Sequence, residues 1–435
     1  MTTARGNDPT RLANWAGNHP YRATQLHRPS SVDELRAIVA RAPKIHALGT
    51  RHCFNDIADS AELVTLEAID QSVAIDRSAQ TVTVNAGIRY GDLARALERE
   101  GLALHNMASL PHISVGGAVA TATHGSGDAN GNLATAVTAL ELVTSDGDIV
   151  NVSRKDDDFA GMVVNLGALG VVTRLTLDVQ PSYLMRQEIF EHLAWEVLFD
   201  QFDAVMASAD SVSLFLDYGD DVGQVWLKTR VAPDDPLPPR EQFLGARAAI
   251  RAVHPVPDLT TESLTDQLGL PGPWLDRLPH FRLDGVPASG AELQSEWMVP
   301  RRKAVEALRA VRDLAPTFRP HLMISEIRTV AADDLWLSTS YGTDIVCFHF
   351  SWILDVDTVV WATGYAPDFG WIKLPIFGKD GYPVHHRGVA EGQEELYFLA
   401  LPFQHTLTST LIGGVGADAR YVAEHLRSRD HSRGS

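Results

Sequence analysis

The chain has few cysteines, and this scarcity limits what can hold its fold together. Its 435 residues include only Cys53 and Cys347, which excludes a disulfide framework. The chain also lacks an apolar run long enough to cross a bilayer, and its first residues, MTTARGNDPT, lack the basic-then-apolar order of a secretion signal. We therefore expect a cytoplasmic protein with no membrane partner.

Basic residues are scarce relative to acidic ones. There are 37 Lys and Arg against 55 Asp and Glu, for a formal net charge of −18. This charge argues against nucleic acid or an anionic membrane as a partner, whereas a neutral small molecule remains compatible with it. Internal repeats and low-complexity segments are lacking, and the length favours two domains over one core. The oligomeric state stays open.

What the chain does have is a stretch of small residues at 106–127, NMASLPHISVGGAVATATHGSG. Gly116, Gly117, Gly125 and Gly127 stand there among serines and threonines, so the backbone can approach a ligand closely. Successive N–H groups in such a run can form a concave nest for a pyrophosphate. The spacing is not GxGxxG, however, and composition alone fits an ordinary small-residue helix contact or loop equally well.

A second segment, 45–55 (IHALGTRHCFN), runs from a short apolar strand into a Gly-Thr-Arg-His turn. Together the two segments resemble the FAD domain of the vanillyl-alcohol-oxidase superfamily, and within it the sugar-alcohol branch of alditol and xylitol oxidases. The resemblance covers about residues 12–352. Further matching pieces follow in the family's order: 14–18 (NWAGN), 166–173 (LGALGVVT), 272–281 (GPWLDRLPHF), 290–297 (GAELQSEW) and 325–333 (SEIRTVAAD).

The resemblance implies an α+β fold in three parts. A two-subdomain, PCMH-type FAD-binding domain is expected at 12–181, and a substrate or cap domain with an antiparallel sheet at 182–352. That cap is truncated relative to the family, because an atypical tail follows at 353–435. Pro181 marks the expected boundary between the first two domains.

Local patterns predict the elements of the first two parts. Ser31 and Glu34 form a capping-box pair, so a helix is expected to begin near Ser31. Strands are predicted at 45–48, 81–85, 171–179, 211–216 and 223–229, a helix at 91–100, a hairpin from 139–144 and 149–152, and an amphipathic helix at 301–314.

The resemblance also assigns the cofactor site. FAD is the expected cofactor, bound covalently through His52, because a neutral imidazole nitrogen is a nucleophile near pH 7. Taken alone, His52 would be an ordinary surface or capping residue; Arg51 and Cys53 stand where the family usually has small residues. The expected cofactor-binding residues are Ala47, Leu48, Gly49, Thr50, Arg51, His52, Cys53, Ser109, Ser114, Gly117, Ala118, Val119, Ala120, His124, Gly125 and Val172.

Two further strands have residues suited to chemistry. In 323–330 (MISEIRTV), Glu326 and Arg328 are two residues apart and so face the same way. In 345–352 (IVCFHFSW), apolar residues alternate with Cys347, His349 and Ser351. From the pattern alone, a solvent-facing side with an incidental salt bridge is the simpler interpretation.

The resemblance reverses that preference. It implies that Glu326, Arg328 and His349 are catalytic and that Ser109, Glu326, Arg328 and Ser351 bind substrate. Glu326 can accept hydrogen bonds from two vicinal hydroxyls, and Arg328 can stabilise an alkoxide as hydride leaves.

The implied activity is oxidation of the terminal CH–OH of a sugar alcohol such as xylitol or sorbitol, with hydride transfer to flavin N5 and reduction of O₂ to H₂O₂. Two alternatives stay open: an aldonolactone oxidase or dehydrogenase of the same superfamily, and a flavin-binding but inactive fusion. An NADPH monooxygenase is the least favoured. We expect no metal site.

After about Ile353 the pattern changes. Residues 357–377 (DTVVWATGYAPDFGWIKLPIF), 396–401 (LYFLAL) and 411–419 (LIGGVGADA) make the tail 355–427 resemble the C-terminus of flavin-containing monooxygenases. Gly414, Gly416 and Ala419 satisfy GxGxxA between a strand-like run and a helix, although the βαβ unit around them is incomplete.

The expected fusion has two consequences. The family's catalytic Lys, in a Trp-Gly-Lys context, is missing, and Lys373 resembles it only superficially. A positioned acid–base group contributes about 10²–10⁴-fold, so its loss predicts a slow enzyme rather than none. Edge strands left by the missing segment are a risk for folding.

Overall fold

The computed structural model describes residues 12–232, 238–285, 292–353, 372, 374–378, 382–393, 396–399, 401 and 412–433. The chain divides into two compact units. The first comprises residues 1–54 and 58–357, and the second comprises 55–57 and 358–435. Within the described ranges, no helix combines the length and apolar character needed to span a bilayer.

The first unit begins with a small parallel sheet in the order β1 (Gln25–His27), β3 (Glu62–Val64) and β2 (Ile45–Ala47). Helix α1 (Val32–Arg41) begins where the capping pair predicts, because Ser31 Oγ accepts from the Glu34 N–H at 3.2 Å. The second half of the predicted capping box is wrong. The Glu34 carboxylate accepts instead from the Ser30 N–H, at 2.8 Å.

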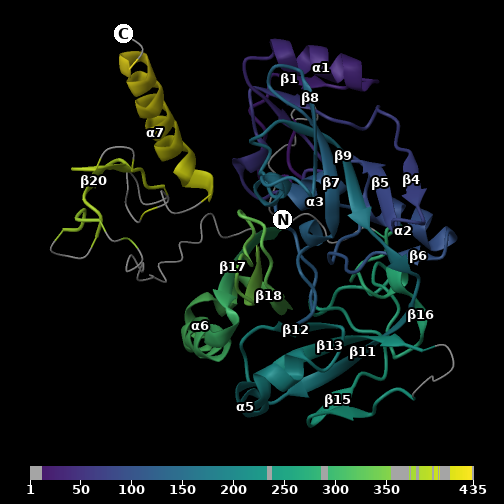
Figure 1. Ribbon diagram of the computed structural model, residues 1–435. Coiled ribbons are helices and arrows are strands. Elements are labelled where there is room, and N and C mark those ends of the chain that lie inside the picture. The colour runs from purple at the N-terminus through teal and green to yellow at the C-terminus, as the bar shows by residue number, and fades with distance from the viewer. Residues whose placement is uncertain are drawn as a thin grey trace, which may run out of the picture. The chain divides into compact units, whose positions relative to one another are not determined.

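A five-stranded antiparallel sheet follows (Figure 1). Its order is β4 (Val73–Asp76), β5 (Thr81–Asn85), β9 (Val171–Asp178), β7 (Val137–Val143) and β8 (Ile149–Ser153). The predicted hairpin is confirmed as β7 and β8, and Gly147 in its turn has φ +79°, a conformation that favours glycine. Short strands β6 (Leu102–Ala103) and β10 (Gln180–Pro181) pair separately.

One apolar core joins these strands to the helices of this region. The helices are α2 (Tyr90–Arg99), α3 (Val115–Ala120) and α4 (Phe159–Val163), with the short 3₁₀ turn η2 (Leu133–Ala136). Another 3₁₀ turn, η1 (Asp56–Ala58), has two of its residues in the segment 55–57 of the second unit. Leu93 and Leu97 of α2 and Val115 of α3 are fully buried in this core with Val82 of β5. Burial of these side chains fixes α3, the helix of the Gly-rich segment, against the sheet.

A nine-stranded antiparallel sheet forms the rest of the first unit. Its order is β14 (Gln242–Phe243), β15 (Ala246–Ala248), β11 (Leu184–Leu193), β13 (Val222–Val231), β12 (Ser211–Leu216), β18 (Leu322–Val330), β19 (Ile345–Ile353) and β17 (Glu292–Pro300), with β16 (Gly272–Pro273) beside β11. The predicted strands at 211–216 and 223–229 are confirmed as β12 and β13, an antiparallel pair. Strands β18 and β19 each have a neighbour on both sides, so the expected unpaired edge does not fall on them.

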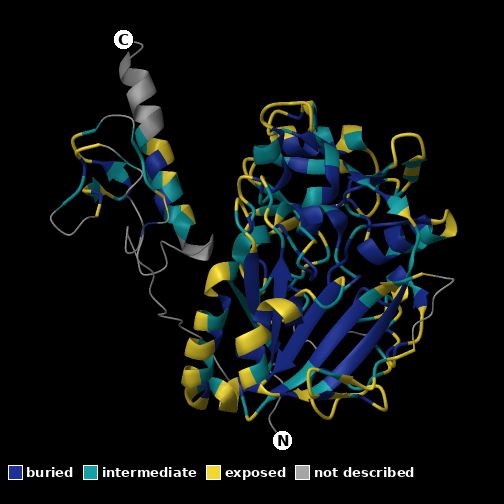
Figure 2. Cartoon of the chain, turned by 60° about the horizontal axis from the view of Figure 1, so that its bottom comes forward, coloured by how far each residue is buried: buried dark blue, intermediate teal, exposed yellow. Residues whose placement is uncertain are grey.

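Helices α5 (Trp195–Met206) and α6 (Ala304–Phe318) cover one face of this sheet, and the 3₁₀ turns η4 (Arg301–Lys303) and η5 (Arg319–His321) flank α6. The 3₁₀ turn η3 (Trp274–Asp276) contacts α2 instead. Phe318 of α6 contacts Phe350 and Trp352 of β19 with ring centroids 6.1 and 6.0 Å apart. Figure 2 shows buried strands beneath a helix whose outer side is exposed. The apolar face of β19 is therefore its helix-packed face, which directs Cys347, His349 and Ser351 to the opposite side.

The second unit contains the hairpin of β20 (His385–His386) and β21 (Val389–Ala390) and the long helix α7 (Ile412–Arg433). The expected order of strand, GxGxxA turn and helix is wrong, because α7 already begins at Ile412 and includes Gly414, Gly416 and Ala419. The segment 357–371 and Lys373 lie outside the described residues.

Candidate active site

The two segments of the expected cofactor site are joined by hydrogen bonds. The Ser114 N–H donates to Thr50 Oγ1 at 3.0 Å, and that hydroxyl lies 3.1 Å from His52 Nδ1. The Trp15 ring stacks on the His52 ring at a centroid distance of 5.5 Å. The Gly-Thr-Arg-His turn therefore lies at the start of α3.

Glycine packs closely at two positions of these segments and is required at one of them, Gly125. A Cβ on Gly49 would overlap Ser114 Oγ, and a Cβ on Gly125 would overlap the Met107 carbonyl and lie 2.6 Å from Asn106 Oδ1. The Gly125 backbone is too close to the Met107 backbone for any side chain, whereas at Gly49 the Ser114 hydroxyl would have to rotate away. Close packing therefore explains the absence of a side chain at Gly125.

His52 has the state and the free atom that a covalent link requires. Burial, followed by the charge of His112, lowers the pKa of His52 to about 4, so its imidazole is neutral near pH 7. Its Nε2 is buried and has no hydrogen-bond partner among the described residues. A buried polar atom without a partner is uncommon and calls for a ligand or a water molecule. His52 thus fits a flavin attachment site.

The other expected cofactor residues lie along the same segments. Ala47 ends β2 and is followed by Leu48, while Gly117, Ala118, Val119 and Ala120 lie in α3. Val172 lies on β9, which packs against α3. Arg51 has φ +65° in the turn, and burial raises the pKa of the Cys53 thiol.

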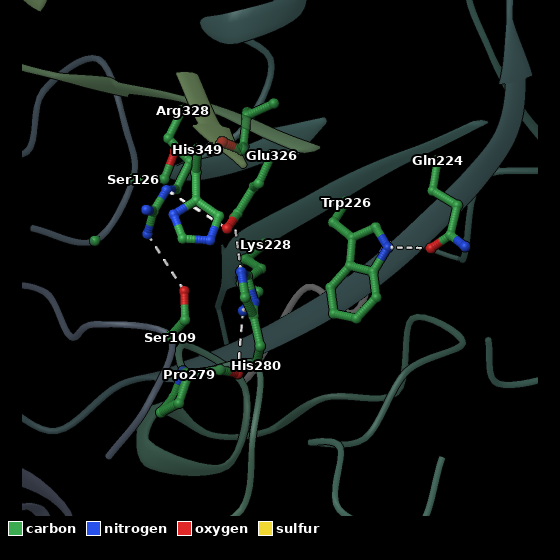
Figure 3. Close-up of polar contacts among 12 residues, drawn as sticks. Ser109, Ser126, Gln224, Trp226, Lys228, Pro279, His280, Glu326, Arg328 and His349 are labelled. Atoms are coloured by element: carbon green, nitrogen blue, oxygen red, sulfur yellow. Dashed lines mark hydrogen bonds and ion pairs between the residues drawn. The ribbon is translucent and has the colours of Figure 1, made fainter. Parts of the chain in front are cut away.

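Three of the expected substrate residues, Ser109, Glu326 and Arg328, meet beside the Gly-rich segment (Figure 3). On β18, Arg328 Nε lies 3.6 Å from Glu326 Oε2, which confirms that the two side chains share a face. Arg328 also donates to Ser109 Oγ at 3.3 Å. The Gly127 N–H donates to the Thr329 carbonyl at 3.0 Å, so the end of the Gly-rich segment is fixed to β18.

Three residues that were not among the predicted site residues complete this cluster. His280 Nε2 lies 2.8 Å from Glu326 Oε1, Lys228 Nζ lies 2.9 Å from His280 Nδ1, and Arg328 donates to Glu296 Oε1 at 2.7 Å. His280 and Glu296 occur in segments with family resemblance, 272–281 and 290–297. The sequence signal for Lys228 was weaker. Lys228 is two positions from Trp226 on a predicted strand and so faces the same side, where a charged residue is unusual.

The ionic groups of the cluster are buried but paired. Burial works to raise the pKa of Glu326, but Arg328 and then His280 outweigh it and hold that pKa well below its usual range. The pKa of Arg328 is raised, because Glu326 and Glu296 outweigh its burial. At neutral pH, Glu326 is therefore a carboxylate beside a guanidinium, a combination that can bind hydroxyls and stabilise negative charge.

His349 and Ser351 lie on the adjacent strand. His349 is directly opposite both Glu326 of β18 and Glu296 of β17, and Ser351 Oγ lies 3.4 Å from His349 Nε2. Burial lowers the pKa of His349, so its imidazole is neutral near pH 7. The sheet therefore brings the sequence-predicted polar residues of both strands to one place.

A cluster of potential metal ligands lies next to Arg328 and includes its partner Glu296. His124, Glu296 and Cys347 place one nitrogen, one oxygen and one sulfur atom within 4.8 Å of one another. Against the effect of burial, Cys347 and Glu296 raise the pKa of His124 to about 10, so it is an imidazolium at neutral pH. Because two cations, His124 and Arg328, already neutralise Glu296, we interpret the cluster as support for Arg328. The His124 side chain thus lies beside the substrate residues, and its expected cofactor role stays a prediction.

We predict that acid destabilises this site before Glu326 is protonated. Burial and the Lys228 charge lower the pKa of His280 to about 4, whereas an unfolded histidine titrates near 6.5. Between these values only the unfolded chain binds the proton, so the free energy of unfolding falls as the pH decreases from about 6.5 to about 4, by about 1 kcal/mol per pH unit for this group. Urea unfolding at pH 7, 6 and 5 measures the slope.

Two variants check the assignment of that slope. His280→Gln removes the titrating group and is expected to reduce the pH dependence. The exposed His321→Gln serves as the control for loss of one imidazole. An equal slope in wild type and His280→Gln would contradict the prediction.

Comparisons with known proteins show what the chain is similar to. Residues 23–153 match the model of an FAD binding domain. The chain is 48% identical over 356 residues to an alditol oxidase of Streptomyces sp., which covers 81% of this chain and 84% of that protein. It is 27% identical over 355 residues to an L-gulono-1,4-lactone dehydrogenase of Mycobacterium tuberculosis, covering 76% and 80%. The crystal structure of a cholesterol oxidase from B. sterolicum shares the fold, with a TM-score of 0.61, 14% identity and 79% of each chain covered.

Proposed function

The chain belongs to the alditol oxidase family, and on that premise we propose that it is an FAD-dependent oxidase of sugar alcohols such as xylitol or sorbitol. The observation that supports the proposal is the group formed by the buried Glu326 and Arg328 with the half-buried Ser109 of the Gly-rich segment. It offers a carboxylate, a guanidinium and a hydroxyl within reach of one another. A polyol presents donors and acceptors on neighbouring carbons and suits such a set.

FAD, when bound, supplies the hydride acceptor and passes the electrons to O₂, which yields H₂O₂. We propose that the chain's own residues bind the polyol and orient it. Glu326 accepts hydrogen bonds from substrate hydroxyls, and Arg328 stabilises the oxygen from which the proton departs. The neutral His349 and Ser351 add polar contacts from β19. His349 can accept a proton because burial keeps it uncharged.

We also propose that His52 holds the flavin covalently. This is supported by its neutral ring, its unpartnered Nε2 and the stacked Trp15. The turn and α3, with the other expected cofactor residues, would surround the cofactor.

H₂O₂ release in the presence of xylitol or sorbitol tests the proposed function. We expect peroxide from the sugar alcohols and little from gulono- or galactonolactone. The reverse preference would assign the chain to the aldonolactone enzymes, to which it is also similar. Reduction of an artificial electron acceptor without peroxide would make it a dehydrogenase, and a flavin-loaded protein with no activity on either substrate class would contradict the proposal.

We also expect the turnover rate of this enzyme to be low. Since the family's Trp-Gly-Lys lysine has no counterpart of matching context in this sequence, we expect turnover to be about 10²–10⁴-fold below that of a complete site.

A further inference from the structure

Lys228 is a buried cation at a position where a strand normally carries an apolar side chain. It lies on β13 in phase with Trp226, and only 1% of its surface is exposed. Its Nζ contacts three acceptors: the Leu278 carbonyl at 2.6 Å, the Pro279 carbonyl at 3.1 Å and His280 Nδ1 at 2.9 Å. Burying an ammonium group without hydrogen-bond partners is unfavourable, so these three contacts are what stabilise Lys228 in this position.

The three contacts determine which nitrogen of His280 has the proton. An ammonium group has three N–H donors and no acceptor. Two of these donors satisfy the carbonyls, and the third points at His280 Nδ1, which must therefore be the unprotonated, accepting nitrogen. In a neutral imidazole the proton is then on Nε2. His280 is neutral near pH 7, as its low pKa indicates.

The protonated Nε2 faces Glu326. Its partner is Oε1, at 2.8 Å, and both side chains are almost fully buried. Phe215 and Trp226 contact the His280 ring edge-on at centroid distances of 5.4 and 5.2 Å. These two contacts fix the orientation of the His280 ring. Figure 3 shows Lys228 and His280 together beside Glu326.

We propose that Lys228 is a positioning residue that acts on Glu326 through His280. By fixing the His280 tautomer, it keeps an N–H on Glu326 Oε1 and so leaves Oε2, on the Arg328 side, to accept a substrate hydroxyl. This inference rests on the proposed function for its effect on turnover, but the tautomer itself does not depend on the substrate.

The charge of Lys228 sets the conditions for a test. Burial lowers its pKa to about 7, opposed by Glu326 and assisted by Arg328. Measurements at pH 6 therefore keep the ammonium populated. A neutral amine could instead accept from Nδ1–H, which would move the imidazole proton away from Glu326.

Nitrogen NMR of the flavin-loaded enzyme with ¹⁵N-labelled histidine measures the tautomer directly. The His280→Gln spectrum assigns the His280 signals by subtraction. We expect a protonated Nε2 and an unprotonated Nδ1 in wild type, and a shift towards Nδ1 protonation in Lys228→Met. Nδ1 protonation in wild type would overturn the proposal, whether or not the variant folds and whether or not polyols are oxidised.

A double-mutant cycle tests the route through His280. Lys228→Met is expected to lower kcat/KM about 10- to 100-fold by misorienting Glu326. A glutamine at 280 donates its amide N–H without a tautomer choice, so Lys228→Met in the His280→Gln background is expected to add little. An equal loss in both backgrounds would mean that Lys228 does not act through His280 and would overturn the proposal.

The matched control is Gln187→Met. Gln187 is paired with Lys228 across β11 and β13, is fully buried, and donates to the Asp266 carbonyl at 3.2 Å. Removing it leaves a similar unsatisfied carbonyl without changing His280. We expect it to lower thermal stability but to leave kcat/KM and the His280 signals unchanged.

Discussion

Replacing Arg328 by methionine is expected to lower kcat for polyol oxidation by about 10²–10³-fold, the usual effect of removing a donor aimed at developing negative charge. The guanidinium is held in place by Glu326, Glu296 and Ser109. Its position beside the carboxylate lets it contact the same substrate oxygen that loses a proton. Peroxide production at saturating xylitol measures the effect, with flavin content determined on the same sample.

Two variants separate chemistry from folding. Arg328→Met leaves the buried carboxylates of Glu296 and Glu326 with less compensation, and breaking such a pair destabilises a protein by about 3–5 kcal/mol. Arg328→Lys keeps the charge but loses the fork geometry, so a smaller loss of kcat is expected. Arg186→Met, another buried arginine, next to Glu188 on β11, is the stability control. A kcat within threefold of wild type in a folded, flavin-loaded Arg328→Met protein would contradict the assigned role.

His52→Ala is expected to abolish retention of flavin by the denatured chain. In wild type, yellow colour should stay with the polypeptide after acid precipitation, since a covalent bond survives loss of the fold. In the variant, all of the flavin should appear in the supernatant, while the glycine packing at Gly49 and Gly125 still permits binding in the folded state. Absorbance of pellet and supernatant near the flavin maximum provides the measurement.

His27→Gln is the matched control for this experiment. His27 is also buried, but its Nε2 already has a partner, Glu62 at 2.6 Å. The control should retain all of its flavin on the denatured chain. Flavin released from acid-denatured wild type would show that His52 makes no covalent bond.

Much of the fold could be predicted because its signals are local. Alternation in 81–85, 211–216 and 345–352 predicted strands that the structure contains, and Ser31 began a helix as expected. The amphipathic run at 301–314 was less exact, because a 3₁₀ turn occupies Arg301–Lys303 and α6 continues to Phe318. In the tail, the GxGxxA motif of Gly414, Gly416 and Ala419 was expected to precede a helix, but the segment from Ile412 is already helical. The resemblance of this tail to monooxygenases stays a prediction.

The sequence by itself determined which residues could do chemistry. His52 in its turn, the Gly-rich segment, and Glu326 and Arg328 two positions apart are all readable from spacing and family resemblance. What only the tertiary structure decided is the environment that gives these groups their charge and orientation. His280 is 46 positions from Glu326, Lys228 is 52 from His280, and Glu296 is 32 from Arg328. Antiparallel pairing of distant strands brings them within hydrogen-bond distance. Because they are buried there, the pKa and tautomer of each group depend on its partner. No local pattern encodes such contacts, because pKa values and tautomers depend on the neighbours that folding supplies.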